Sequence, residues 1–419
     1  MAGGMSRIGG ATAILLALIL GLVAGIGAGA APDGWADRAI GIAEPVGRLW
    51  LRALQMTIVP LVVALLITGI TTAARAARAG KLAGRAIATF LVVLWSSSLT
   101  AALLTPLFLD LVPLPTQSAA ALRAALAGTE PLGTSPGIGA FVTGIIPNNP
   151  VAAAAESNIL GLIVFTLFFG FAITRLPEAP KETLTDLFKA IADAMLVVIG
   201  WVLAVAPIGI AALAFVVGAR AGAGAFGALL HYIFIVSAVG CVVLFAAYPL
   251  AVIGGRVRPM AFARAVAPAQ AVAISTQSSL ASLPAMLIAA SRLGVPAATA
   301  DIVLPLAVAL FRATGPAMNL AVALYVAHWF GVDLGPGAIA LGVAAAAITT
   351  MGAVSLPGSI SFFTSIAPIA LAIGAPLEPL ALLIAVETIP DIIRTVGNVS
   401  MDVAVTATVS ARGGERQSA

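Results

Sequence analysis

The chain has 419 residues, of which 61% are hydrophobic and only 9% are charged, and its mean hydropathy is +1.12. Soluble globular proteins carry about 25% charged residues, so the composition excludes that class. The net charge of +4 comes without a long basic cluster, which argues against a nucleic-acid partner. The single cysteine, Cys241, excludes an internal disulfide and a cysteine-based zinc site, and we interpret it as a small apolar packing residue.

Several apolar segments reach the roughly 20 residues that a helix needs to cross a bilayer. The clearest are residues 11–30 (ATAILLALILGLVAGIGAGA) and residues 86–112. Neither alternates as the strands of a membrane barrel would, so helices are the remaining way to span the membrane. We predict an all-α polytopic membrane protein whose first apolar segment is a span and not a cleaved signal peptide. Full spans are expected near residues 11–31, 44–72, 84–112, 141–175, 186–217, 226–254, 301–331 and 375–408.

Two further apolar segments, 259–291 and 337–372, are each interrupted in the middle. The first contains STQSSLAS (275–282), and the second contains TTMGAVSLPGS (349–359). Non-helical backbone at membrane depth is tolerated only where protein buries it or where it lines a cavity. Two such segments are typical of a transporter's binding site. We therefore predict two re-entrant helical hairpins, in preference to kinks that only help helices to pack.

The distribution of charge predicts the orientation. Residues 75–85 contain only basic charges, whereas the loop around residues 31–44 is mainly acidic. Basic loops stay on the cytoplasmic side, so eight spans with both termini in the cytoplasm fit the pattern. The first hairpin then enters from the cytoplasm and the second from outside. We expect the protein to be integral to the plasma (inner) membrane.

The last predicted span carries a row of polar side chains within an apolar sequence. Its members are Glu387, Asp391, Arg394, Asn398 and Asp402, with Thr395 at the edge of the row. Steps of three and four residues place them within a stripe of roughly 60° on a helix. A charge at the bilayer centre costs at least about 2.5–3.5 kcal/mol, so the stripe should face the protein interior. Asp391 and Arg394 are spaced to pair, but the row exceeds what an ion pair needs, and we predict a ligand site. Pro390 predicts a kink beside it.

Together with four other motifs, this row resembles the dicarboxylate/amino acid:cation symporter family, the glutamate-transporter relatives. The motifs are IIPNNPVAAAAESNILGLIVFTLFFGFAI (145–173), APIGIAALA (206–214), STQSSLASLPAM (275–286), SLPGS (355–359) and DIIRTVGNVSMD (391–402). The resemblance covers nearly the whole chain. It implies eight transmembrane helices plus two re-entrant hairpins, arranged as inverted repeats in a homotrimeric, elevator-type transporter.

The resemblance also implies a division of the chain. Residues 1–83 (spans 1 and 2) and 141–217 (spans 4 and 5) would form a scaffold. Residues 84–112 (span 3) and 226–410 would form a transport domain, with hairpins at 259–291 and 337–372. Residues 411–419 would be a cytoplasmic tail.

Substrate roles follow from the same resemblance. Asp391 would accept an α-ammonium group and Arg394 a side-chain carboxylate, with Thr395 and Asn398 completing the cradle. The hairpin residues that would hold the α-carboxylate are Ser278, Ser279, Leu356, Pro357 and Gly358. Independently of any family, a guanidinium binds carboxylate bidentately and stays protonated. We expect uptake of aspartate or glutamate; a C4-dicarboxylate, or another polar amino acid such as cystine, stays open.

The coupling cation is less clearly marked. The family's Asn-Met-Asp-Gly-Thr signature is expected at residues 318–322 (MNLAV), where Leu320 and Val322 lack the oxygen atoms of the family's residues. Sodium needs several oxygen ligands, and the candidates are Asp402, Asn398, Asn319 and Ser97, with sodium most plausible at Asp402 and Asn398. Glu387 is the candidate for proton coupling, ahead of His328. Arg312 either lies beside the site or extends to the membrane surface.

Two other classes of function fit the sequence less well. A channel would need pore-lining charges from several helices or subunits instead of one compact acid-and-base row. A hydrolase would need a nucleophile with a base, yet Ser278 has no evident histidine partner, and neither an HExxH motif nor a nucleophile elbow occurs. We expect no enzymatic activity and no cofactor beyond a coupling Na+ or H+.

Overall fold

The computed structural model describes residues 7–30, 35–78, 80–114, 146–156, 158–222, 224–352 and 358–413. The described residues form helices and connecting turns without strands, which confirms the all-α prediction. Six helical segments in this part of the chain are long and apolar enough to cross a membrane: Thr12–Gly29, Trp35–Arg78, Lys81–Leu111, Glu178–Ala204, Gly224–Gly254 and Ala297–Phe330.

The first four helices are α1 (Arg7–Gly29), α2 (Trp35–Gln55), α3 (Ile58–Arg78) and α4 (Lys81–Leu111). The predicted span 44–72 lies within the segment Trp35–Arg78, in which a turn at residues 56–57 separates α2 from α3. Thr57 lies at this turn, with its hydroxyl donating to the Leu54 carbonyl at 2.8 Å. The predicted span 84–112 corresponds to α4.

The middle of the chain forms α7 (Pro150–Ala155), α8 (Ile159–Ile173), α9 (Glu178–Ala204), α10 (Ala206–Ala221) and α11 (Gly224–Pro249), which continues into the π-helical turn η1 (Leu250–Gly254). Asn149 and Asn158 cap α7 and α8 through their side-chain oxygens. The predicted span 186–217 is divided at Val205. Pro207 lies in the first turn of α10, where its missing N–H is not needed.

Both interrupted segments contain two helices, and residues 353–357 between the two helices of the second segment lie outside the described residues. The first gives α12 (Pro259–Thr276) and α13 (Ser279–Arg292), which contact one another. Gln277 adopts a left-handed conformation with φ of 50°, and the Ser278 Oγ caps α13 by accepting from Ala281 N. The second gives α16 (Pro336–Gly352) and α17 (Gly358–Ile373), also in contact. In the first segment, the polar residues therefore interrupt the helix as predicted.

The remaining helices are α14 (Ala297–Leu310), α15 (Thr314–Phe330), α18 (Glu378–Leu383) and α19 (Thr388–Gly413). The predicted span 301–331 is broken at residues 311–313. The predicted kink at Pro390 is wrong: α19 begins at Thr388, so Pro390 lies in its first turn, where proline is tolerated.

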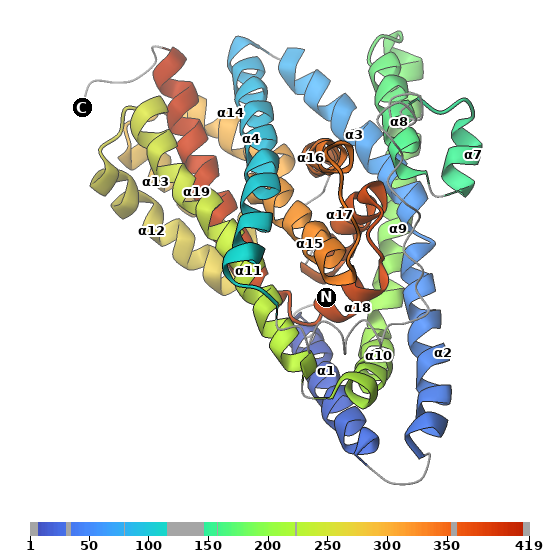
Figure 1. The fold of residues 1–419 in the computed structure, drawn as a ribbon. Helices are drawn as coiled ribbons and strands as arrows, with labels where there is room; N and C mark the ends of the chain where they lie inside the picture. The colour runs from blue at the N-terminus through green and yellow to red at the C-terminus, as the bar shows by residue number, and fades with distance from the viewer. Residues whose placement is uncertain are drawn as a thin grey trace, which may run out of the picture.

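The helices form two neighbouring groups (Figure 1). In one, α19 contacts α11, α12, α13 and α14, while α4 contacts α15 and α16. In the other, α10 contacts α1 and α2, and α3 contacts α8 and α9. The groups meet where α3 contacts α4, α16 and α17. Helices α15 and α19 are almost entirely buried, so most polar residues on them lie in the interior of the molecule, whereas His328 and Arg412 near their C-terminal ends are exposed.

Candidate functional site

The polar row of α19 is buried. The exposed fractions of its members are Glu387 3%, Asp391 8%, Thr395 5%, Asn398 4% and Asp402 0%, and the Arg394 side chain is 12% exposed. The prediction that this row faces the protein interior is confirmed. Helical spacing alone brings these side chains to one face, and α11 and α15 cover it.

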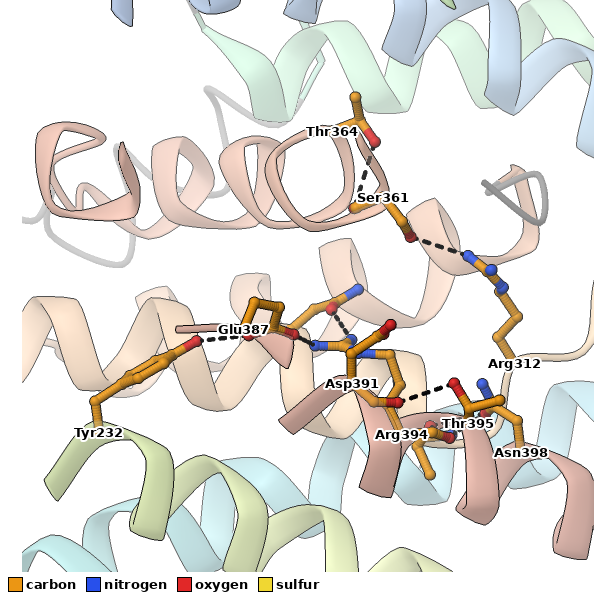
Figure 2. Close-up of polar contacts among 11 residues, drawn as sticks. Tyr232, Arg312, Ser361, Thr364, Glu387, Asp391, Arg394, Thr395 and Asn398 are labelled. Carbon is orange, nitrogen blue, oxygen red and sulfur yellow. Dashed lines mark hydrogen bonds and ion pairs between the residues drawn. The ribbon is translucent and has the colours of Figure 1, made fainter. Parts of the chain in front are cut away.

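Arg394 is the centre of the cluster (Figure 2). Its guanidinium donates to Glu387 Oε1 at 2.6 Å and to Asn319 Oδ1 at 2.5 Å, and its Nε lies 3.5 Å from Asp391 Oδ1. A guanidinium has five N–H donors in a planar fork. These contacts fix its position and leave donors for a further carboxylate.

Glu387 bridges two helices through its two carboxylate oxygens. One oxygen accepts from Arg394, and the other accepts from the Tyr232 hydroxyl of α11 at 2.9 Å. Glu387 therefore belongs to the same cluster as Arg394. Tyr232 was not identified from the sequence, because nothing local marks a buried tyrosine on a distant helix.

Asn398 ties α19 to the first turn of α15. Its Oδ1 accepts from the backbone N–H of Thr314 at 2.9 Å and from the Thr314 hydroxyl at 2.7 Å. Beside them, the Ser97 hydroxyl of α4 donates to the Ala313 carbonyl at 2.5 Å. Ser97 and Asn398, two of the predicted cation ligands, thus meet at the break between α14 and α15.

The position expected for the family signature in span 7, residues 318–322, lies inside the continuous helix α15. The non-helical residues of this span are Phe311, Arg312 and Ala313. Asn319 accordingly contacts Arg394 and not the break. The signal that could have located the break is the sequence TGP (314–316), since proline favours the first turn of a helix.

Arg312 extends from this break toward α17. Its guanidinium donates to the Ser361 hydroxyl at 3.1 Å, so it turns to the protein interior instead of the membrane surface (Figure 2). Its charge also acts on the carboxylates of Asp391 and Asp402. The second of the two interpretations left open by the sequence is therefore wrong.

The four predicted cation ligands do not converge on one point. Asn319 contacts Arg394, while Ser97 and Asn398 contact the break. Asp402 is fully buried, and neither of its oxygens has a hydrogen-bond partner among the described residues. In this part of the chain no group of three or more His, Cys, Asp or Glu side chains could hold a metal ion.

The structure describes only some of the predicted hairpin residues. Ser278 and Ser279 are half-buried at the turn between α12 and α13. Leu356 and Pro357 lie outside the described residues, and Gly358 begins α17. His328 is an exposed residue of α15, nine positions from Asn319, or about 13 Å along a helix, so it does not belong to the Arg394 cluster.

Comparison of the sequence with known proteins identifies the family. The sequence model of the Sodium:dicarboxylate symporter family matches residues 11–412. The chain is 27% identical to the Proton/glutamate-aspartate symporter of Escherichia coli (strain K12), over 92% of this chain and 89% of that protein. It is 26% identical to C4-dicarboxylate transport protein 2 of Ralstonia nicotianae (95% and 88% covered) and 27% identical to Neutral amino acid transporter A of Homo sapiens (93% and 80% covered). With the family matched along nearly its whole length, the chain belongs to the sodium:dicarboxylate symporter family and is a cation-coupled secondary transporter, not an enzyme.

Proposed function

We propose that this symporter takes up an acidic amino acid, aspartate or glutamate, together with a cation. The observation that carries the proposal is the buried pair of Asp391 and Arg394 one helical turn apart on α19. A carboxylate and a guanidinium on one face complement the ammonium group and the second carboxylate of such a substrate. A neutral amino acid would offer the Arg394 guanidinium no side-chain carboxylate.

The contacts of Asp391 support its role toward the ammonium group. Its only described ion pair is the 3.5 Å approach to Arg394 Nε, which is longer than the 2.6 Å bond between Arg394 and Glu387. Charge-assisted N–H···O bonds are usually about 2.7–2.9 Å long. Asp391 therefore retains acceptor capacity for a substrate, whereas Glu387 acts mainly on Arg394.

A C4-dicarboxylate is the second candidate, and Arg312 is the observation that favours it. Two guanidinium groups act on the region around Asp391, and each could bind one carboxylate. The Asp391 carboxylate opposes this alternative, because a dicarboxylate has no ammonium group to neutralise it. Members of the family include both a proton/glutamate-aspartate symporter and a C4-dicarboxylate transport protein.

We assign proton coupling to Glu387. It is buried, and the charged or titratable groups that face it are Arg394 and Asp391 on α19 and Tyr232 on α11. A proton on Glu387 would weaken its hold on Arg394 and free the guanidinium for the substrate carboxylate. Cation binding and substrate binding would then favour the same state, which symport requires.

The transport movement belongs to the same proposal. Helices α4 and α11–α19 would slide as one domain against a scaffold of α1–α3 and α7–α10, with the α16–α17 hairpin as the outer gate. The helix breaks in α12–α13 and α16–α17 support this assignment, since such breaks flank the binding sites of transporters. We further propose a homotrimer in the inner membrane with both termini in the cytoplasm.

Uptake by purified protein in proteoliposomes tests the substrate. Labelled aspartate, glutamate and succinate are offered under a pH gradient and, separately, under a sodium gradient. We expect aspartate or glutamate to accumulate, and unlabelled substrate inside the vesicles to accelerate entry of label by exchange. Accumulation of succinate alone would replace the proposal with the dicarboxylate alternative.

Replacement of Arg394 tests the site. Arg394→Ala should reduce acidic amino acid uptake by at least about 100-fold, because the buried carboxylates Glu387 and Asp391 lose their counter-charge and the substrate loses its partner. Arg292→Met, which removes an exposed arginine at the end of α13, is the matched control. Normal aspartate uptake by Arg394→Ala would show that the assigned role is wrong.

A further inference from the structure

The break between α14 and α15 carries a fixed positive charge inside the molecule. Arg312 is the central residue of the three that form the break, and its guanidinium is held by the Ser361 hydroxyl of α17 at 3.1 Å. Figure 2 shows its side chain extending from the break to α17, on the side of α19 that carries Asp391. Its charge acts on both Asp391 and Asp402.

Asp402 has only this charge to compensate it. The residue is 0% exposed, and neither carboxylate oxygen has a hydrogen-bond partner among the described residues. Asp402 lies one helical turn after Asn398, whose Oδ1 accepts from Thr314 at the end of the break. Arg312 is the charged side chain of the described residues that acts on Asp402. A buried carboxylate without a partner is strongly unfavourable, so Asp402 needs either a positive charge nearby or a proton, and Arg312 supplies a permanent charge.

Two of the oxygen atoms around the break accept hydrogen bonds from donors of the protein. The Ala313 carbonyl accepts from Ser97, and Asn398 Oδ1 accepts from Thr314. The side chain of Phe311 has no oxygen and stacks on Phe90, with ring centroids 4.6 Å apart. Sodium needs several oxygen ligands at once, and a guanidinium close by repels it.

We propose that Arg312 takes the place of a coupling sodium ion beside Asp402, so that this transporter works without sodium and is driven by protons. The proposal rests on the proposed symport function and names its coupling ion. The buried cluster then contains three carboxylates, Glu387, Asp391 and Asp402, against two guanidiniums. Protons are the cations that can still enter this cluster, because they need no set of oxygen ligands.

The first experiment measures sodium binding without any substrate. The melting temperature of the detergent-purified wild type is compared in NaCl and in choline chloride at equal ionic strength. We expect no sodium-specific stabilisation of the wild type, because a ligand stabilises a protein only if it binds the folded state. Saturable stabilisation by sodium at millimolar concentrations would overturn the proposal, whatever the transported substrate is.

The second experiment uses charge variants. Arg312→Met removes the charge and keeps an unbranched side chain, and it should gain sodium-specific stabilisation that the double variant Arg312→Met/Asp402→Asn loses again. Arg312→Lys keeps the charge and should remain insensitive to sodium. A folded Arg312→Met that sodium does not stabilise would show that Arg312 does not fill the place of a cation. If Arg312→Met does not fold, the wild type and Arg312→Lys decide: sodium-specific stabilisation of either overturns the proposal, and its absence from both supports it.

Uptake adds a separate test. Coupled ligands usually change one another's affinity by about 5- to 150-fold. Sodium should change wild-type uptake under a fixed pH gradient by less than about twofold and should stimulate Arg312→Met at least about fivefold. If Arg312 is instead a carboxylate ligand of a dicarboxylate, sodium will not rescue the variant. Absence of uptake of any acidic substrate by the wild type would contradict the proposed function, while the stability measurements would still decide the role of Arg312.

Discussion

At the residue scale, Glu387 is the group that links Arg394 to the rest of the molecule. It accepts from Arg394 on one oxygen and from Tyr232 on the other. A substrate carboxylate that binds the remaining donors of Arg394 competes with Glu387 for the charge of the guanidinium. Whether Glu387 carries a proton therefore decides how readily Arg394 is released to the substrate.

Glu387→Gln should uncouple transport from the proton gradient. Glutamine is nearly the same size and neutral at every pH, so it resembles the protonated residue permanently. One pH unit can drive about tenfold accumulation per coupled proton, and the variant should lose this accumulation while retaining exchange of labelled for unlabelled substrate. Proteoliposomes with and without a pH gradient measure both.

Tyr232→Phe is the control for this variant. It removes the hydroxyl that donates to Glu387 but leaves the carboxylate in place, so accumulation driven by the pH gradient should persist at a reduced rate. If Glu387→Gln accumulates substrate as the wild type does, another group carries the proton.

The α19 row could be predicted from the sequence because its members share one helix. Steps of three and four residues determine which side chains share a face before any tertiary structure is known. Tyr232 and Thr314 could not be predicted, because they reach the row from α11 and α15, and neither could Ser361 of α17, which contacts Arg312. Which turns of different helices meet depends on packing across the whole molecule.

At the element scale, apolar segments predicted the helices better than their breaks. The breaks at residues 311–313 and 56–57 lie within mainly apolar sequence and contain one polar residue each, so neither was predicted. The break within residues 275–282 was predictable, since a cluster of polar residues marks it. Arg312 is the one polar residue of the break at 311–313. Its role could not be inferred from the sequence, because it depends on Asp402, which lies far along the chain on α19.

Helices α1 and α10 provide a test of packing at this scale. Gly21, Gly25 and Gly29 repeat every four residues along α1 and face α10. A Cβ atom at Gly25 would lie 2.1 Å from the Phe215 carbonyl oxygen, so the two backbones approach as closely as glycine allows. Small residues at such spacing are typical of tightly packed membrane helices.

Gly25→Leu should therefore destabilise the protein by at least about 1–3 kcal/mol, the usual range for overpacking. The backbone of α10 cannot move aside as a side chain could. Gly27→Leu is the matched control, because nothing lies within 4 Å of a Cβ built at that residue. Melting temperatures in detergent measure both variants, and equal stability would show that α1 and α10 are not packed in this way.

At the scale of the whole molecule, α3 makes many of the contacts between the two groups of helices. Helix α3 contacts α8 and α9 of its own group and α4, α16 and α17 of the group that contains α19, and α17 also contacts α8 and α9. The polar cluster lies within the group that contains α11, α15 and α19. Substrate and cation would therefore move with that group. A sliding movement would therefore change the contacts between α3 and α16 and preserve those between α3 and α8.

Cross-links distinguish these two contacts. In a Cys241→Ala background, cysteine pairs placed on facing turns of α3 and α16 should abolish uptake when oxidised, and reduction should restore it. The control is the pair Ile70→Cys and Gly170→Cys between α3 and α8, since a Cβ at residue 170 would lie 3.6 Å from the Ile70 Cβ, within the range for disulfides of about 3.5–4.5 Å. Its oxidation should leave uptake unchanged, because both helices belong to the proposed scaffold. Full cross-linking of α3 to α16 without loss of uptake would rule out a relative movement of the two groups and place alternating access within the α16–α17 hairpin instead.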